Sequence, residues 1–333
     1  MIIESSAPAR IDLAGGTIDI WPLYLFHHGA LTLNVAIDLY AVTRINTRED
    51  SSITIRSVDQ KLKASAPDLP SLGSPPGLEL IVEALRFFGH HQGMEITVHC
   101  FAPAGSGLGG SSALLISLLG ALNRLTENPY QPEELISLAR DLECRVLGVP
   151  TGVQDHYAAV FGGVNAIWLR PHKIEIEKID IDLDELRDWM LLVYLGKPRF
   201  SGKPNWRIMK RHIDGDSNIF AIFERIRNIS QRMREAVFQQ DWERMGNLLV
   251  QEWENRKALS PAPWYRRIDQ LFEMVVPYGG VAVKSCGAVG GGCVLVWVEK
   301  GHKQLAKKLL QEKGARAIDF GLSARGLKVR VVE

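Results

Sequence analysis

Residues 103–113 read PAGSGLGGSSA, and they lie between an expected strand at 94–101 and an apolar helical run at 114–125. Glycine lets the backbone turn tightly and approach a ligand closely. The start of a helix presents unpaired N–H groups and the positive end of the helix dipole, and both suit a phosphate group. The stretch therefore predicts a strand–loop–helix unit with an anion site at the start of the helix.

Known phosphate-binding patterns fit this loop unequally. A Walker A loop ends in Gly-Lys-Ser/Thr, and no lysine follows the glycines here. Gly105, Gly107 and Gly110 match the GxGxxG of dinucleotide-binding proteins. That motif is followed about 20 residues later by an acid at the end of a second strand, but here this position falls in an expected turn at 128–131. The protein-kinase motifs are missing as well. A turn without a ligand remains the alternative, and two adjacent serines whose hydroxyls could reach a phosphate-bound Mg²⁺ argue against it.

Outward from this loop, the first half of the chain mixes strands with helices. Alternating apolar and polar residues indicate strands, and a helical period indicates helices. Strands are expected at 31–45, 51–58, 94–101 and 164–169, and helices at 78–88, 114–125 and 133–147. Residues 59–77 contain four prolines and little periodicity, so we expect an exposed connection there.

The second half has the same mixed character. It begins with an expected strand at 189–195 and a loop rich in Gly, Pro and Lys at 196–205. Two long helices are expected at 216–239 and 241–258, and the remainder reads helix, strand, helix, strand. The pattern predicts an α+β protein with an N-terminal domain at 1–186 and a C-terminal domain at 187–333. Residues 173–187, where acidic and apolar residues alternate, are the candidate junction.

Composition excludes several classes of protein. The chain has 333 residues, 46% of them hydrophobic, and a formal net charge of +1, which argues against nucleic-acid binding. Its start resembles no secretory signal, and its longest apolar stretch, 113–122, is about half of the roughly 20 residues that span a membrane. Four cysteines without metal-like spacing are expected to be free thiols, as in the cytoplasm. The sequence leaves open whether the protein is a monomer or a homodimer.

Basic residues and histidine pairs outside the loop are further candidates for ligand contacts. The basic run 210–212 with Arg207 could contact a phosphate, although a solvated helix face is the simpler interpretation. The histidine pairs at 27–28 and 90–91 lack a third ligand at metal-like spacing, so we do not expect either pair to bind a metal.

One glutamate stands in an unusual place on the expected helix 133–147. Ile136, Ala139, Glu143 and Leu147 fall on one helical line that is otherwise apolar. A charge on such a line is costly unless it has a partner. Glu143 is therefore either a glutamate that reaches the surface or a carboxylate ligand for Mg²⁺, a cation that prefers one or two carboxylates together with phosphate oxygens.

A second acid follows the loop 149–154. Asp155 stands near a helix start, where an aspartate often serves only as a cap. Phosphoryl transfer, however, needs a group that accepts or orients the proton of the attacking hydroxyl, and a cation beside the transferred phosphoryl. Asp155 could be the first and Arg10 the second, since Arg10 lies in an early strand before a Gly-Gly turn and Asp19.

Three motifs, in this order, resemble those of the GHMP kinase superfamily (galactokinase, homoserine kinase, mevalonate kinase and phosphomevalonate kinase). They are PARIDLAGG at 8–16, PAGSGLGGSSA at 103–113 and KSCGAVGGG at 284–292. The last departs from the usual motif at Val289, where a glycine is more common. Because the motifs extend from residue 8 to residue 292, the resemblance covers nearly the whole chain.

The resemblance implies a fold and a set of roles. The fold would combine an N-terminal domain like the second domain of ribosomal protein S5 with a ferredoxin-like C-terminal domain, and ATP and substrate would lie between them. Ser111 and Glu143 would hold Mg²⁺, Asp155 would be the catalytic aspartate, and Arg10 would lower its pKa and stabilise transferred charge. The nucleotide-binding residues would be Pro103, Gly105, Ser106, Gly107, Leu108, Gly109, Gly110, Ser111 and Ser112.

The acceptor follows less directly from the motifs. Galactokinases have Gly-Glu-His-Thr-Asp-Tyr after the first strand, whereas this chain has Gly-Gly-Thr-Ile-Asp-Ile at 15–20. The pattern is more similar to fucokinases and glycero-manno-heptose 7-phosphate kinases, which implies that Gly16, Thr17 and Asp19 bind a sugar or sugar phosphate. Asn205-Trp206 also resembles the heptose-phosphate kinases. An ATP-dependent decarboxylase and a non-catalytic ATP-binding protein of the same superfamily remain alternatives.

Overall fold

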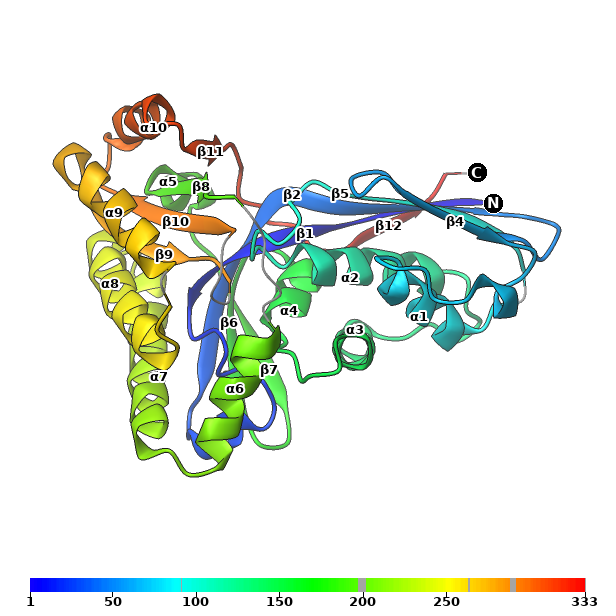
Figure 1. Cartoon of the computed structure of the whole chain (residues 1–333), viewed down its shortest axis with the longest axis horizontal. Helices are drawn as coiled ribbons and strands as arrows, with labels where there is room; N and C mark the ends of the chain where they lie inside the picture. The colour runs from blue at the N-terminus through cyan, green and yellow to red at the C-terminus, as the bar shows by residue number, and fades with distance from the viewer. Residues whose placement is uncertain (91, 197–201, 263, 288–291, 333) are drawn as a thin grey trace.

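The computed structural model describes residues 1–90, 92–196, 202–262, 264–287 and 292–332. Within these residues the strands form two sheets, and Figure 1 shows the longer sheet extending from the centre of the molecule toward the two chain ends. Its strands are β1 (Ile2–Ala14), β2 (Leu31–Thr47), β3 (Ile53–Ser57), β4 (Leu62–Ala66), β5 (Met94–Cys100), β6 (Val164–Leu169), β7 (Ile174–Ile179) and β12 (Lys328–Val331).

The longer sheet is built around β1 and β2. Its order is β12-β1-β2-β5-β3-β4, and β6 joins β2 and carries β7. The first half of β2 pairs with β6 and the second half pairs with β5, so this one long strand serves two parts of the sheet. The pairs are antiparallel except for β3 with β5. Consequently, Arg10 near the end of β1 lies where the sheet changes partners.

One face of the longer sheet is covered by α1 (Glu79–Phe88), α2 (Gly110–Asn123), α3 (Pro132–Leu147) and α4 (Gln154–Phe161). The α2 helix contacts β1 and β2 on one side and α1, α3 and α4 on the others. Ten of its fourteen residues are buried, which explains why its sequence is apolar all round rather than on one stripe. This central position fixes the start of α2, where the glycine-rich loop ends.

The second sheet has the order β11-β8-β10-β9 and is formed by β8 (Met190–Tyr194), β9 (Gly280–Ser285), β10 (Cys293–Val298) and β11 (Arg316–Ile318). The helices that follow β7 along the chain are α5 (Leu183–Asp188), α6 (Gly202–Ile213), α7 (Ser217–Phe238), α8 (Trp242–Leu259), α9 (Tyr265–Val275) and α10 (Lys303–Glu312). Short 3-10 helices are η1 (Leu23–Phe26), η2 (Pro70–Leu72) and η3 (Val276–Tyr278). The succession strand, helices, strand, strand, helix, strand is that of a ferredoxin-like unit, as expected.

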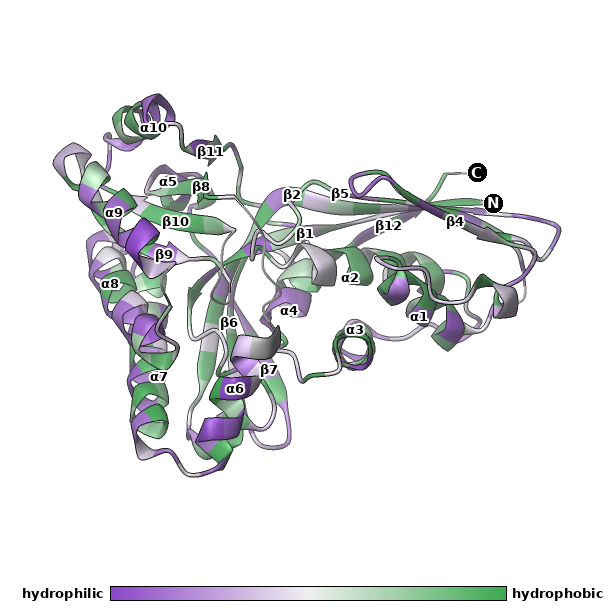
Figure 2. Cartoon of the chain, viewed as in Figure 1, coloured by the Kyte–Doolittle hydropathy of each residue, from purple (hydrophilic) through white to green (hydrophobic). Residues whose placement is uncertain are grey.

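Both faces of the second sheet are buried. Val294 and Val296 of β10 pack into a core with α9 and α10, whereas Leu295 and Trp297 pack into a core shared with α7, α8 and the ends of β1 and β2. Every residue of β10 is buried, and Figure 2 shows the strand hydrophobic along its length. The shared core joins the two sheets, so that loops from both halves of the chain meet at one place.

The α+β prediction is confirmed, and five local expectations change. Where one strand was expected between the last two helices, the structure has two, β9 and β10. The expected connection 59–77 contains β4, which pairs with β3, together with η2. The candidate junction 173–187 contains β7, which belongs to the longer sheet. The expected loop 196–205 overlaps α6 from Gly202 onward, while its residues 197–201 are outside the described part. β11 was not predicted. Each missed strand is short and gains its stability from a neighbouring strand rather than from its own pattern.

The chain returns to its beginning at its end. β12 pairs with β1, and Figure 1 shows the two termini side by side. The expected domain boundary at residue 186 therefore stays a prediction. The last strand of the chain, β12, belongs to the longer sheet.

Candidate active site

A cavity of about 460 Å³ lies where the glycine-rich loop, β1, α3 and α4 meet segments from the second half of the chain. This volume is in the range of small-molecule sites. The predicted residues that line it are Arg10, Gly16, Thr17, Asp19, Pro103, Gly105, Ser106, Gly107, Gly109, Gly110, Ser111, Ser112, Glu143 and Asp155. Leu108 is the exception, because its side chain is fully buried in the core shared by the two sheets.

The glycine-rich loop needs its glycines for two physical reasons. Gly105, Gly107 and Gly109 have φ values of +66°, +75° and +73°, a region that costs other residues energy. A Cβ at Gly107 would lie 2.8 Å from the backbone nitrogen of Gly287, so the loop passes directly against the second half of the chain. Gly109 is the N-cap of α2, and among the described residues no side chain caps this helix. Its first N–H groups are therefore available to an anion.

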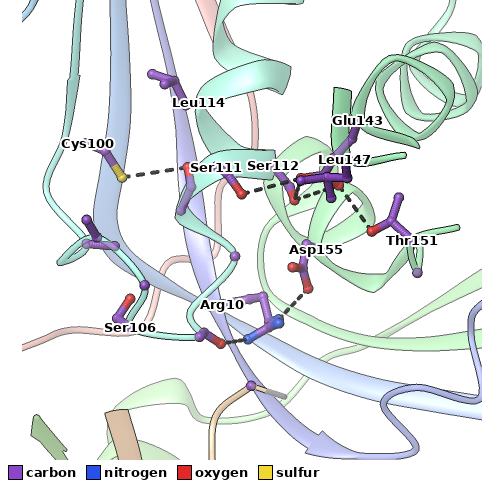
Figure 3. Close-up of a pocket in the computed structure, with 18 of the residues that line it drawn as sticks. Arg10, Cys100, Ser106, Ser111, Ser112, Leu114, Glu143, Leu147, Thr151 and Asp155 are labelled. Atoms are coloured by element: carbon purple, nitrogen blue, oxygen red, sulfur yellow. Dashed lines mark hydrogen bonds and ion pairs between the residues drawn. The ribbon is translucent and has the colours of Figure 1, made fainter. Parts of the chain in front are cut away.

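Hydroxyl groups converge on Glu143, as Figure 3 shows. Glu143 Oε1 accepts hydrogen bonds from the hydroxyls of Ser112 at 3.1 Å and Ser111 at 3.3 Å, and Oε2 accepts one from Thr151 at 3.3 Å. The imidazole Nε2 of the fully buried His156 lies 3.3 Å from Glu143 Oε2. The prediction that Glu143 lies on a buried helical line is thus confirmed. The alternative, a glutamate that reaches the surface, is wrong, because its carboxylate is held by these partners.

The pKa of Glu143 lies below its ordinary value. Burial alone would raise it, but His156 and the hydroxyls of Ser112 and Thr151 outweigh that effect by stabilising the charged form. A buried carboxylate that stays charged beside an exposed serine hydroxyl suits a hard cation. Two oxygens at right angles on one Mg²⁺ lie about 3.0 Å apart at the usual bond length of about 2.1 Å. The 3.3 Å between Ser111 Oγ and Glu143 Oε1 fits such a pair.

Arg10 and Asp155 form an ion pair in the wall of the cavity. Arg10 Nε donates to Asp155 Oδ1 at 2.6 Å, while Nη1 donates to the carbonyls of Gly107 at 2.5 Å and Cys286 at 2.9 Å. Burial would lower the pKa of Arg10, but Asp155 and Asp12 raise it above its ordinary value. Arg10 therefore holds Asp155 against the glycine-rich loop and against the second half of the chain at once.

Asp19, and not Asp155, stabilises the start of α4. Asp19 Oδ2 accepts hydrogen bonds from the backbone N–H groups of Val153 at 2.8 Å and Gln154 at 3.0 Å. Gly152 is needed there, because a Cβ at this position would lie 2.2 Å from the same oxygen. Burial, followed by the charges of Asp155 and Asp12, raises the pKa of Asp19 to about 6 although the two N–H groups oppose the shift. The simple capping interpretation of Asp155 is accordingly wrong, since Asp155 pairs with Arg10.

A buried cluster of four charges lies behind the Gly-Gly turn. Lys284 Nζ contacts Asp12 Oδ2 at 3.0 Å and Glu252 Oε1 at 3.8 Å, and Arg256 Nε contacts Glu252 Oε1 at 3.0 Å. Arg256 Nη1 also donates to the hydroxyl of Thr17 at 2.7 Å. Thr17 has a φ of +72°, an unusual value for a β-branched residue. This cluster was not predicted from the sequence, in which a lysine within the otherwise apolar segment 281–286 was a signal for it.

The remaining predictions concern the basic run at 210–212, the cysteines and the possible metal ligands. Lys210 and Arg211 are exposed and pair with Asp214 and Asp216, as a solvated helix face does. All four cysteines are free. Among the described residues, no group of three or more His, Cys, Asp and Glu side chains could hold a metal. The pair at 90–91 and the motif at 284–292 lie partly outside the described residues.

The sequence also matches two family models. Residues 79–163 match the N-terminal domain of GHMP kinases, and residues 233–316 match the C-terminal one, which together are about half of the chain. The chain belongs to the GHMP kinase superfamily. It is therefore a phosphotransferase with an alcohol group as acceptor, as predicted.

Two relatives match this GHMP kinase along nearly its whole length. It is 25% identical to the D-glycero-alpha-D-manno-heptose 7-phosphate kinase of Campylobacter jejuni, and the match covers 98% of each chain. It is 26% identical to the L-fucokinase/L-fucose-1-P guanylyltransferase of Bacteroides fragilis, over 98% of this chain and 38% of that longer protein. The crystal structure of a D-glycero-D-manno-heptose 1-phosphate kinase from Bacteroides thetaiotaomicron is similar with a TM-score of 0.77, at 25% identity and 99% coverage of each chain.

These relatives confirm the expected branch of the superfamily, and the solved structure confirms the expected two-part fold. Within the described part of this GHMP kinase, no helix is both long and apolar enough to cross a bilayer.

Proposed function

We propose that this GHMP kinase uses ATP and Mg²⁺ to phosphorylate a hydroxyl group of a sugar or sugar phosphate, with an activity like that of heptose 7-phosphate kinases or fucokinases. The observation that carries the proposal is the Arg10–Asp155 ion pair, held at 2.6 Å against the glycine-rich loop. The names of the two relatives support a sugar or sugar phosphate as the acceptor. The free cysteines agree with a reducing compartment such as the cytoplasm.

In the proposed reaction, the chain supplies mainly position and charge. Asp155 accepts or orients the proton of the attacking hydroxyl, and Arg10 holds Asp155 in place and stabilises the charge that develops on the phosphoryl group. The backbone N–H groups at the start of α2 hold the phosphates of ATP. Ser111 and Glu143 would hold Mg²⁺, which offsets phosphate charge when bound. Gly16, Thr17 and Asp19 form the wall against which the acceptor would lie.

Charge also favours a kinase site at this position. Asp155 and Asp19 line the same cavity as the glycine-rich loop with its backbone N–H groups and Glu143 with its hydroxyl partners. An attacking hydroxyl is activated by a carboxylate, while a phosphate chain is bound by N–H groups and by a cation on the carboxylate. The cavity thus contains groups that suit each of the two substrates of phosphoryl transfer.

The first experiment is an ADP-release screen of the purified chain with Mg-ATP. The acceptors are free sugars, sugar phosphates, homoserine and mevalonate. We expect turnover with a sugar or sugar phosphate, and a stable phosphate ester as the product. Release of inorganic phosphate and CO₂ would instead indicate a decarboxylase. ATP binding without turnover across the panel would indicate a non-catalytic protein and refute the proposal.

A further inference from the structure

The turn at 15–20 forms part of the cavity wall, and α8 from the second half of the chain holds it. The backbone N–H of Gly15 donates to Glu252 Oε1 at 3.3 Å, and Arg256 Nη1 donates to the hydroxyl of Thr17 at 2.7 Å. Arg256 Nε also donates to Glu252 Oε1 at 3.0 Å, and the two residues are one helical turn apart. One face of α8 therefore contacts this turn at two points.

Thr17 has a strained backbone conformation. Its φ of +72° lies in the left-handed region, which costs a β-branched residue energy. The carbonyl of Thr17 accepts a hydrogen bond from the N–H of Ile20 at 3.2 Å, so the same conformation closes the turn that carries Asp19. A contact that holds Thr17 in this conformation therefore also helps to fix the position of Asp19 in the cavity wall.

Gly16 allows Arg256 to approach the turn closely. A Cβ at Gly16 would lie 2.6 Å from Arg256 Nη2 and 2.5 Å from Asp12 Oδ2, and both distances are too short for a side chain. Arg256 Nη2 itself donates to Asp12 Oδ2 at 3.5 Å. The second glycine of the Gly-Gly turn is thus needed so that the guanidinium can lie against the backbone.

The guanidinium of Arg256 is bound by the protein itself. Its three nitrogens all have acceptors in the chain, namely Glu252 for Nε, Thr17 for Nη1 and Asp12 for Nη2. Burial would lower the pKa of Arg256, but Glu252 and Asp12 raise it above its ordinary value. A charged donor also makes a stronger hydrogen bond than a neutral one. These contacts indicate that Arg256 acts by fixing other groups of the chain.

We propose that Arg256 is a positioning residue for the acceptor, because its hydrogen bond to Thr17 holds the turn at 15–20 in the conformation that binds the acceptor beside Asp19. This inference rests on the proposed kinase function and adds a residue of α8 to the recognition of the acceptor. Without this bond the turn populates other conformations, and the acceptor binds only the molecules with the competent turn. The KM for the acceptor then rises, while kcat at saturating acceptor is retained.

The first test is Arg256→Lys. This variant keeps a positive charge beside Glu252 and Asp12, but its single ammonium group lacks the planar fork that reaches three acceptors at once. We expect the KM for the acceptor to rise by about 10- to 100-fold, the range for one hydrogen bond to a charged group, with kcat and the Kd for ATP within about threefold of wild type. An unchanged KM for the acceptor, or a loss of kcat at unchanged KM, would overturn the inference.

Arg232→Lys is the matched control for this substitution. Arg232 is an exposed residue of α7 that donates to Gln251 of α8 at 3.3 Å, and it does not line the cavity. The control should have wild-type kinetics, because it changes an arginine contact of α8 far from the turn in function. A rise of the acceptor KM equal to that of Arg256→Lys would show a general effect on α8 and overturn the inference.

A second variant, Thr17→Val, shows whether Arg256 acts through Thr17. It removes the hydroxyl that Arg256 contacts and leaves every charge of the buried cluster in place. The acceptor KM should rise here as well, and the double variant should be no worse than the more affected single variant, because both changes break the same hydrogen bond. Effects that multiply in the double variant would show that the two residues act independently and would overturn the inference.

Unfolding in urea gives a readout that needs no acceptor. For the wild type, the two single variants and the double variant, the effects on the equilibrium constant for unfolding should depart from multiplication by at least about threefold. Independent effects would contradict the coupling between Arg256 and Thr17. Absence of turnover by the wild-type enzyme with every acceptor would refute the kinase proposal itself, whatever the unfolding data show, so the two failures are distinguishable.

Discussion

Replacing Asp155 by asparagine tests the proposed mechanism most directly. Asparagine keeps the size of the side chain and an oxygen that can accept the hydrogen bond that Arg10 Nε now donates at 2.6 Å. Arg10 also keeps its bonds to the carbonyls of Gly107 and Cys286, so the guanidinium should remain in place. The substitution therefore removes a charge and a proton acceptor while it preserves the geometry of the site.

The expected loss follows from the role given to Asp155. A positioned general base contributes about 10²- to 10⁴-fold, so kcat should fall by that factor, which corresponds to about 3–5 kcal/mol of transition-state stabilisation. The Kd for ATP should change by less than about threefold, because the loop N–H groups and the Ser111–Glu143 pair are untouched. The cost in folding stability should be about 1–3 kcal/mol, since Arg10 loses its charged partner but not its hydrogen bonds.

The assay measures ADP release at saturating Mg-ATP and acceptor, together with calorimetric titration of ATP. Asp141→Asn is the matched control, because Asp141 lies on the surface of α3 and pairs only with the neighbouring Arg140 within the described chain. It should have wild-type kinetics. An Asp155→Asn enzyme with kcat within tenfold of wild type would refute the proposed role, and equal losses of kcat and ATP binding would indicate damage to the site instead.

Three further predictions concern the carboxylates and the buried lysine. Glu143→Gln should raise the Mg²⁺ concentration for half-maximal activity at least tenfold, because one charged ligand is lost; an unchanged Mg²⁺ titration would contradict the assignment. The raised pKa of Asp19, about 6, means that its folded form binds a proton more tightly than its unfolded form, so its contribution to stability is lost as pH rises from about 4 to about 6. Asp19→Asn should therefore gain about 2–3 kcal/mol relative to wild type between pH 4 and pH 7 in urea unfolding, and a constant difference would contradict this pKa. Lys284→Met should cost about 3–5 kcal/mol of unfolding free energy because it leaves Asp12 and Glu252 buried with less compensation, and a loss below about 1 kcal/mol would show that the cluster does not depend on it.

Sequence alone determined the features that depend on neighbours along the chain. The glycine-rich loop and the helix after it could be predicted, because the conformation of glycine and the unpaired N–H groups of a helix start are local properties. The periodicity of 133–147 likewise placed Glu143 on a buried line. The three motifs, found in order along the chain, identified the superfamily.

Only the tertiary structure decided which groups meet across the chain. Asp19 and the start of α4 are 134 residues apart in sequence, and Arg10 reaches a carbonyl 276 residues away. The same holds for the cluster of Asp12, Glu252, Lys284 and Arg256, and for the hydrogen bond from Arg256 to Thr17. Such contacts depend on how the two sheets pack on their shared core, which no local pattern records. Sequence could name the chemistry of the site, but the fold decided which carboxylate pairs with Arg10 and which one holds the helix.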